Sequence, residues 1–183
     1  MSTISPDELM ELCRLIKQGN KDALRRLFLT MQPKIFSYLL RYTGIREVAE
    51  DLTQETFINF WLSKDKIISE QTCIAYLYKI ARNQALNHVS RTVRTLPIDD
   101  ENPNSHWEKM GNNEIPEVFI FDDYQKALNT LPTRCRETFL LSRFSGLKYS
   151  EIAEIMGVSQ QTVKNQMNKA ISILRLRLSQ YLK

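Results

Sequence analysis

The sequence predicts an all-α protein with two small helical domains joined by a flexible acidic linker, the C-terminal domain being a helix-turn-helix. Apolar residues recur at helical spacing along most of the chain. Only 5 glycines and 6 prolines occur among 183 residues, which favours long helices and few turns. One internal stretch loses the periodicity and is rich in acids and prolines. We therefore expect domains over residues 1–94 and 122–183, with the linker over 95–121.

The amino-acid composition limits the classes of function that this chain is expected to have. Hydrophobic residues make up 43% of the chain, enough for real cores, and the formal net charge is +4. Cys13, Cys73 and Cys135 lie far apart without CxxC spacing, so we expect buried thiols, with neither a disulfide framework nor a zinc site. Nothing indicates a metal, a cofactor or a small-molecule substrate. No signal peptide and no apolar run of membrane-spanning length is visible, so we expect a cytoplasmic protein.

The first part of the chain has the pattern of successive helices. Ser5, followed by proline and three residues later by glutamate, is typical of a capped helix start. Asn20 is the expected cap of the next helix. Pro33 is expected to start or kink a further helix, which ends at Gly44.

The helix expected from about Ile45 to Ser63 has two unlike sides. One side is an acidic row that runs into an apolar residue: Glu47, Glu50, Asp51, Gln54 and Ile58. Phe57, Trp61 and Leu62 make the C-terminal half apolar nearly all round, so it must pack on two sides or meet a partner. An acidic row suits DNA poorly. We interpret this helix as a protein-binding surface, although simple solvation also explains a lone acidic row.

A helix from about Cys73 to Arg91 is expected after a surface loop at 64–72. Its polar side interleaves an aromatic ring, a cation and amides, from Tyr76, Lys79, Asn83 and Asn87, and it is flanked by Arg82 and Arg91. Aromatic rings stack on unpaired bases while cations hold the phosphates. The face therefore fits a single-stranded nucleic acid, and it equally fits a plain solvated surface with one exposed tyrosine.

Two short helices joined by a glycine turn are expected between Tyr149 and Lys169. Ser150 and Ser159 are the expected N-caps, and Gly157 the left-handed helix end, which together make a helix-turn-helix. The second helix presents groups of the types that read base edges and phosphates: Gln160, Gln161, Thr162, Lys164, Asn165, Asn168 and Lys169. No acidic residue follows Glu154, so the charged side chains beyond it are all cations. The positive field that they create favours a polyanion as the partner.

Three motif blocks, in this order, resemble the extracytoplasmic-function (ECF) sigma factors of bacterial RNA polymerase, in the sigma-70 family. Residues 49–57, AEDLTQETF, are similar to the segment that grips the clamp helices of the largest polymerase subunit. Residues 76–83, YLYKIARN, together with Asn87, are similar to the segment that melts and reads the −10 element. Residues 131–169 resemble the domain that reads the −35 element.

The resemblance implies a non-catalytic protein that binds core RNA polymerase and directs promoter recognition, DNA melting and transcription initiation. It assigns polymerase binding to Glu50, Asp51, Gln54, Glu55 and Ile58. It also assigns −10 reading to the polar side of the helix over 73–91, and −35 reading to the second helix of the helix-turn-helix. By family habit, a membrane-bound anti-sigma factor is a further expected partner.

Two other classes of function compete with this interpretation. A stand-alone helix-turn-helix regulator would need a dimerisation surface that places two recognition helices about one DNA turn apart. The sequence has neither a coiled-coil heptad repeat nor a receiver-like alternation of strands and helices, so no such dimerisation surface is indicated. An enzyme, such as a nuclease, would need paired carboxylates with a histidine, a nucleophile elbow or a glycine-rich phosphate loop, and none is visible.

Overall fold

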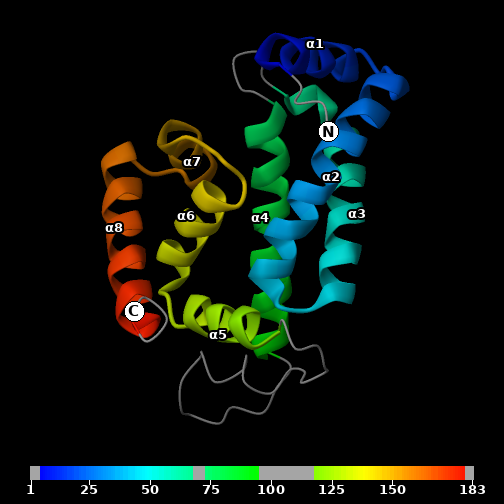
Figure 1. The fold of residues 1–183 in the computed structure, drawn as a ribbon. Coiled ribbons are helices and arrows are strands. Elements are labelled where there is room, and N and C mark those ends of the chain that lie inside the picture. The colour runs from blue at the N-terminus through cyan, green and yellow to red at the C-terminus, as the bar shows by residue number, and fades with distance from the viewer. Residues whose placement is uncertain (1–4, 68–72, 95–117, 180–183) are drawn as a thin grey trace.

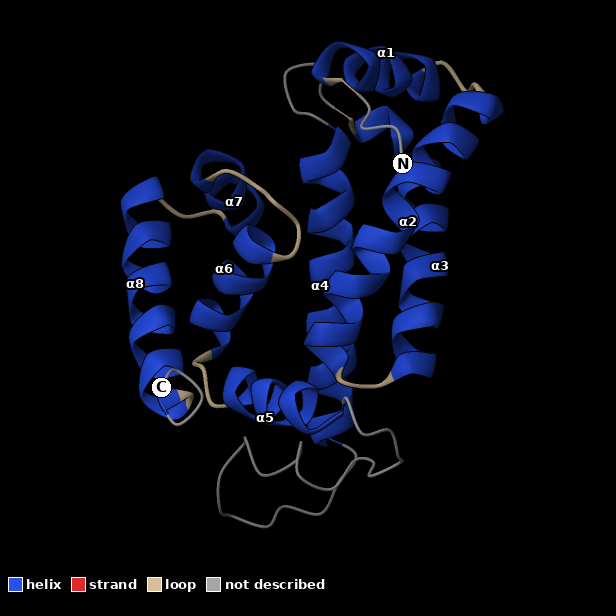
Figure 2. Cartoon of the chain, in the orientation of Figure 1, coloured by secondary structure: helices blue, strands red, loops and turns tan. Residues whose placement is uncertain are grey.

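The structure, a computed structural model, describes residues 5–67, 73–94 and 118–179. Within these ranges it contains eight α-helices, one 3-10 turn and no strand, so the all-α prediction is confirmed (Figure 1, Figure 2). The elements are α1 (Pro6–Lys17), α2 (Lys21–Thr43), α3 (Arg46–Leu62), η1 (Lys64–Lys66), α4 (Cys73–Arg94), α5 (Val118–Asn129), α6 (Thr133–Arg143), α7 (Tyr149–Met156) and α8 (Gln160–Arg177). None of the helices in the described ranges is both long and apolar enough to span a bilayer.

Helices α2, α3 and α4 pack alongside one another, and α1 lies across one end of them (Figure 1). Tyr38 of α2, Phe60 of α3 and Tyr78 of α4 are fully buried. Helix α2 runs through Pro33 as a single helix of 23 residues, so Pro33 does not start a new helix. This longer α2 gives the domain a continuous scaffold against which α3 and α4 pack.

Three of the predicted helix boundaries are confirmed by their hydrogen bonds or backbone angles. The Ser5 hydroxyl accepts from the Glu8 backbone N–H at 3.2 Å, and the Asn20 side chain accepts from the Ala23 N–H at 3.0 Å. Gly44 ends α2 with a φ of 74°, in the left-handed region where a side chain would be strained.

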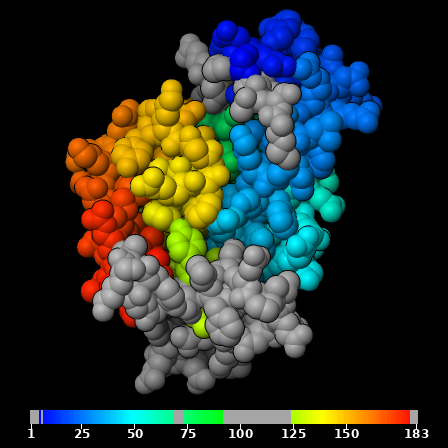
Figure 3. Space-filling model, viewed as in Figure 1, coloured from blue at the N-terminus to red at the C-terminus, as the bar shows by residue number. Residues whose placement is uncertain are grey.

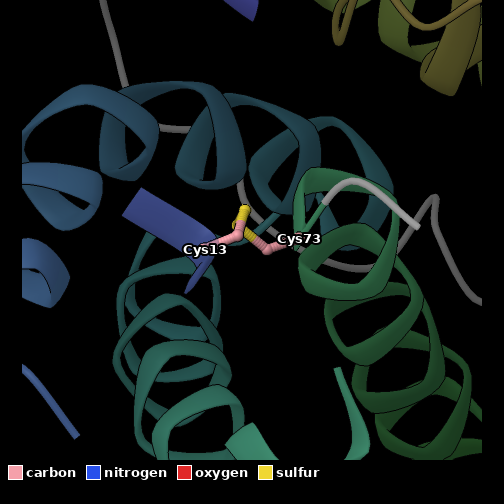
Figure 4. The surroundings of a disulfide bond; sticks show 2 residues. All are labelled: Cys13 and Cys73. Atoms are coloured by element: carbon pink, nitrogen blue, oxygen red, sulfur yellow. A yellow bond between two sulfur atoms is a disulfide. The ribbon is translucent and has the colours of Figure 1, made fainter. Parts of the chain in front are cut away.

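A disulfide joins Cys13 of α1 to Cys73, the first residue of α4 (Figure 4). The expectation of buried thiols is therefore wrong for two of the three cysteines. The pair is 60 residues apart in sequence, and its Cα atoms come within 5.8 Å because α1 folds back across the end of the bundle. Cys135 stays a buried free thiol, and burial raises its pKa.

The C-terminal helices form the expected helix-turn-helix. Gly157 ends α7 with a φ of 65°, and the Ser159 hydroxyl accepts from the Thr162 N–H at 3.1 Å to start α8. The cap expected at Ser150 is wrong, because α7 begins at Tyr149 with Lys148 as its N-cap residue. The Glu151 carboxylate accepts from the Lys148 backbone N–H at 2.7 Å and fixes the helix start two residues earlier than an N-cap at Ser150 would.

Helix α5 begins at Val118, inside the range 95–121 in which the sequence predicts a linker. The remaining part of that range, residues 95–117, lies outside the described residues, as do residues 68–72 of the predicted loop. Beyond α5 the chain turns back, so that α6 and α7 pack against α2 and α4. In Figure 3 the yellow side chains of the α6–α7 segment lie directly against the blue side chains of α2. Helical periodicity carries no information on this contact between the two halves, so it was not predicted.

Candidate nucleic-acid interface

The polar face of α8 points away from the rest of the protein. Buried residues on its opposite side hold the helix against α6 and α7: Val163, Met167, Ala170 and Leu174. Six of the seven predicted reading residues are exposed: Gln160, Gln161, Lys164, Asn165, Asn168 and Lys169. Thr162 is half-buried, and its hydroxyl lies 2.9 Å from that of Ser159 in the helix cap. Thr162 therefore helps to build the helix start as well as lying beside the reading face.

Two side-chain amides on the exposed face of α8 are hydrogen-bonded to each other in the free protein. The Gln161 Nε2 donates to Asn165 Oδ1 at 3.0 Å, one helical turn away. On the inner side, the buried Thr138 hydroxyl of α6 donates to the Gln166 side-chain oxygen at 2.7 Å and anchors α8. Every charged side chain of α8 is a cation, and the N-terminal end of the helix dipole adds further positive potential. This face suits phosphates and base edges of duplex DNA.

Helix α4 carries a second polar row with a different make-up. Lys79, Asn83, Asn87 and Arg91 are all exposed and follow one another at intervals of four residues, which aligns them on one side of the helix. Tyr76, one turn before Lys79, is half-buried, and its ring centre lies 6.2 Å from that of Phe60. The row combines amides that offer both donors and acceptors with cations next to an aromatic ring, a mixture suited to unpaired bases.

Arg82 does not lie on this exposed row. Its side chain is buried against the C-terminal half of the chain, where its Nη2 donates to Glu137 Oε2 of α6 at 2.9 Å. The sequence places Arg82 on the flank of the polar face, because helical spacing says nothing about what covers that flank. A DNA contact by Arg82 therefore requires the two halves to separate.

The exposed surface of α3 combines charge with apolar side chains. All five residues predicted to bind the polymerase are exposed: Glu50, Asp51, Gln54, Glu55 and Ile58. Beside them a hollow of about 460 Å³ opens between α2 and α3, lined by Lys21, Leu24, Arg25, Phe28, Gln54, Phe57, Ile58, Trp61 and Leu62. The α2 side of this hollow was not predicted, because Leu24 and Phe28 share the helical period of the core residues around them.

The three surfaces lie on an all-helical fold that ends in a helix-turn-helix, an architecture typical of transcription factors. Comparison with family models agrees with this class. The model for sigma-70 region 2 matches residues 27–95, and the model for sigma-70 region 4 matches residues 121–174. The first match covers most of α2 through α4, and the second covers the helix-turn-helix with the helices before it.

Curated relatives match along nearly the whole chain. The RNA polymerase sigma-H factor of Pseudomonas aeruginosa is 27% identical, over 91% of this chain and 92% of its own length. The ECF RNA polymerase sigma-E factor of Haemophilus influenzae is 25% identical, over 91% and 93%. Among solved structures, CnrH, in complex with the cytosolic domain of CnrY, has a TM-score of 0.74 at 19% identity and covers 93% of this chain and 97% of its own.

The chain belongs to the sigma-70 family, as an ECF sigma factor. It therefore binds core RNA polymerase and directs promoter recognition, DNA melting and transcription initiation. The alternative of a stand-alone helix-turn-helix regulator is not favoured, because both the N-terminal and the C-terminal halves match sigma regions. Sigma factors are in general initiation factors and not enzymes.

Proposed function

We propose that three exposed faces divide the work of initiation: α3 binds the polymerase, the row on α4 holds the melted −10 strand, and α8 reads the −35 duplex. In this division an N-terminal domain over residues 1–94 performs the first two tasks, and a C-terminal domain from α5 onward performs the third. The observation that supports the proposal best is that the three faces lie on different helices, are all exposed and differ in chemistry.

On α3, carboxylates beside an apolar hollow suit a basic protein partner with apolar side chains to bury. Asp51 and Gln54 are exposed on the side that also carries Ile58, which is 57% exposed. Apolar area supplies most of the binding free energy at such contacts, and the charges supply orientation and encounter rate. We assign this surface, with Glu50 and Glu55, to the clamp helices of the largest polymerase subunit.

On α4, binding must favour the separated strand over the duplex. A protein with no energy source of its own can only stabilise a melted state that the DNA already reaches spontaneously. Asn83 and Asn87 can each pair with the edge of an unstacked base, and Tyr76 can stack on one. Lys79 and Arg91 are placed to contact phosphates on either side. The Tyr76 ring must then leave its contact with Phe60 or stack on its free face.

On α8, Asn165 and Asn168 are placed to reach base edges in the major groove, with Gln161 at the helix start. Lys164 is placed beside them, and Lys169 is placed to contact the backbone. The lack of any acidic residue in α8 supports contact with DNA along its whole length.

Two further parts of the proposal concern the protein that controls this chain and its location in the cell. CnrH was solved in complex with the cytosolic domain of CnrY, and RpoE of Bartonella quintana, 23% identical to this chain with a TM-score of 0.68, was solved with the anti-sigma factor NepR. We infer that this chain is likewise controlled by an anti-sigma factor, one bound to the membrane. We also infer that the chain acts in the cytoplasm and has no catalytic step of its own, since the polymerase supplies the chemistry.

Run-off transcription tests the proposal. The chain is mixed with core polymerase and fragments of the source genome, and transcripts are compared with those of core polymerase alone. We expect discrete new transcripts whose start sites share two upstream sequence elements. Co-elution with core polymerase on a sizing column is expected alongside. The absence of both co-elution and new transcripts would contradict the proposal.

A further inference from the structure

One covalent bond joins the N-terminal helix to the helix that carries the proposed −10 face. Cys13 of α1 is bonded to Cys73, the first residue of α4, and Figure 4 shows the two side chains meeting between these helices. Cys73 is fully buried, and Cys13 is 9% exposed. The third cysteine, Cys135, is a free thiol. The chain therefore pairs two of its three cysteines, although 60 residues separate them.

This bond is unexpected in the setting that we infer for the protein. A sigma factor works beside RNA polymerase and promoter DNA in the cytoplasm, where glutathione and thioredoxin keep thiols reduced. Disulfides that do form in the cytoplasm are usually transient, and they serve catalysis or redox sensing. In that compartment the bond between Cys13 and Cys73 is expected to form only under oxidising conditions.

The geometry of the pair allows the bond to form and to break. The two Cα atoms are 5.8 Å apart, within the ordinary range for a disulfide, so the helices need not move for the sulfurs to join. Cys73 lies at the N-terminal end of α4, a helix of 22 residues. The positive end of a helix dipole favours a sulfur anion, which attacks when a disulfide forms and leaves when one is reduced.

The bond is also placed where it can control order at the start of α4. The first four N–H groups of a helix lack partners within the helix, and the first turn of α4 carries no acidic side chain to complement them. Helix ends open locally at a small cost in free energy, and a cross-link to α1 raises that cost. Tyr76 lies three residues after Cys73, with its ring centre 6.2 Å from that of Phe60. The bond therefore holds in place the turn that carries Tyr76.

We propose that Cys13 and Cys73 form a reversible redox site, whose disulfide orders the first turn of α4 and pre-organises Tyr76 to stack on an unpaired base. The inference rests on the single-strand binding proposed for α4. It deepens that function by adding a chemical signal that changes the strength of the binding. The oxidised protein is the form that binds the separated strand more tightly. The oxidant is a peroxide, and the reductant is a dithiol.

The oxidation is balanced with one peroxide for each disulfide. Cys13, the more exposed sulfur, attacks a peroxide oxygen as a thiolate. The O–O bond breaks, and the second oxygen leaves and takes up a proton as an alcohol or water. The Cys73 thiolate then attacks the resulting sulfenic acid, which forms the S–S bond and releases water. Two electrons pass from the two sulfurs to the peroxide.

The reduction is balanced with one dithiol for each disulfide. A thiolate of the dithiol attacks one sulfur of the Cys13–Cys73 bond and forms a mixed disulfide. The second thiol of the reductant then closes the reductant's own disulfide. Both cysteines of the chain are released as thiols, and the protein returns to the form with the looser α4 start.

A thiol count tests the redox site itself. The full chain is equilibrated in glutathione buffers of different disulfide-to-thiol ratio, denatured, and labelled with a maleimide that adds a fixed mass to each free thiol. We expect three labelled thiols in reducing buffers and only Cys135 labelled in oxidising ones. The change should fall within the range of cytoplasmic glutathione ratios, and hydrogen peroxide should restore the oxidised form. A bond that persists at every such ratio, or that peroxide does not restore, would overturn the proposal.

Hydrogen exchange and strand binding test the effect on α4. Reduction should speed amide exchange in the first turn of α4 and leave exchange in α6 unchanged. Binding of a fluorescein-labelled oligothymidylate, followed by anisotropy, should weaken about 3- to 10-fold if the turn is formed in roughly 10–30% of reduced molecules. Binding of a labelled duplex, which we assign to α8, should not change. Equal exchange and equal strand binding in the two redox states would contradict the proposal.

Cysteine variants supply the matched controls. Cys13→Ser and Cys73→Ser should behave as the reduced wild type in both buffers. Cys135→Ser, which removes the free thiol, should respond to peroxide as the wild type does. If Cys73→Ser, at a fully buried position, loses its helical circular dichroism, Cys13→Ser and the reduced wild type carry the comparison. A Cys13→Ser variant whose strand binding still responds to peroxide would also overturn the proposal.

Failure of the redox site is distinguishable from failure of the proposed function. A bond that responds to glutathione and changes exchange in α4, in a chain that binds no oligothymidylate in either state, would contradict the function of α4 and leave the redox site intact. A chain that directs run-off transcription and binds the strand equally in both states would contradict the redox site alone.

Discussion

Asn165 and Lys169 lie one turn apart on the exposed side of α8 and are expected to have different effects on DNA binding. An amide can make two hydrogen bonds to one base edge, whereas an ammonium contacts phosphates of any sequence. Asn165→Ala should therefore relax the −35 sequence preference, with a loss of about 1–3 kcal/mol of discrimination. Lys169→Ala should weaken binding to all sequences equally and reduce the salt slope by about one.

Binding titrations on a matched and a mismatched −35 duplex at several salt concentrations distinguish these two roles. Gln161 donates to Asn165 in the free protein, so Gln161→Ala should resemble a partial loss of Asn165. If Lys169→Ala changed base preference while Asn165→Ala did not, the assignment would be reversed.

Three buried tyrosines around the interface between the halves make the protein sensitive to alkali. Burial raises the pKa of Tyr78 from 10.0 to about 12. Burial, and after it the nearby Glu137 carboxylate, raises the pKa of Tyr42, and burial raises that of Tyr38 well above its ordinary value. Because these folded-state pKa values lie above the unfolded value, their contribution to stability is complete below pH 10 and is lost above it.

The free energy of unfolding should therefore fall between about pH 10 and pH 12, by about 1.4 kcal/mol per pH unit for each phenol. Burial also lowers the pKa of Arg136, but its guanidinium donates to two backbone oxygens and keeps its charge, so the phenols dominate the slope. Urea denaturation at several pH values measures the slope. Tyr78→Phe should flatten it, and Tyr149→Phe, at an exposed position, should leave it unchanged. A denaturation midpoint that does not fall above pH 10 would contradict the expectation.

At the scale of the element, α3 is expected to determine whether the protein assembles with polymerase. Asp51 is exposed, so Asp51→Lys should leave the fold intact while placing a cation where the clamp is expected to present one. We expect loss of co-elution with core polymerase and an unchanged circular dichroism melt. Glu154→Lys, an equal change of charge on α7, should co-elute normally. Normal co-elution of Asp51→Lys with core polymerase would contradict the assignment of this α3 surface to polymerase binding.

Helix α1 is held to the start of α4 by the Cys13–Cys73 disulfide. Closing a loop of about 60 residues reduces the entropy of the unfolded chain and is worth about 4 kcal/mol in the chain-entropy model. Cys73→Ser, or addition of dithiothreitol to the wild type, should lower the free energy of unfolding by up to that amount. Dithiothreitol should have no further effect on Cys73→Ser. Equal stability of oxidised and reduced wild-type protein would show that the bond does not stabilise the fold.

Local patterns predicted the helices well, and contacts between distant helices poorly. The caps at Ser5, Asn20 and Ser159 follow from side chains within three residues of the N–H groups they accept from, so the sequence contains the whole interaction. The start of α7 was misplaced because Glu151 competes with Ser150 for the same helix end. The disulfide and the Arg82–Glu137 pair depend on how helices pack, and helical periodicity carries no information on that packing.

For the candidate site too, predictions from local spacing were better than predictions that depend on how helices pack. Exposure of the predicted residues on α3, and of all but Thr162 on α8, follows from amphipathic spacing, and the structure agrees with it. Burial of Arg82 and the hollow beside Phe28 arise where one helix meets another, and there the spacing predicted the wrong environment.

At the scale of the whole molecule, the arrangement separates the tasks in space. Helix α8 lies on one side of the molecule and α3 on the opposite side, with α4, α6 and α7 between them (Figure 1). The surfaces proposed for the polymerase and for the −35 duplex are thus both exposed in this arrangement. The exposed row on α4 is accessible as well, whereas Arg82, which pairs with Glu137 at the junction of the halves, becomes available only when the halves separate.

Permanganate footprinting of the promoter complex tests the central claim, that α4 holds a melted strand, most directly. Wild-type protein with core polymerase should make thymines of the −10 region reactive. Asn83→Ala and Tyr76→Ala should lose this reactivity on duplex promoter, since each removes a contact with an unpaired base, worth about 1–3 kcal/mol for a stacked ring. On a template with a pre-melted bubble, Tyr76→Ala should recover substantially, and Asn59→Ala, an exposed asparagine of α3, should match the wild type throughout. Wild-type reactivity of both Asn83→Ala and Tyr76→Ala on the duplex template would contradict the account.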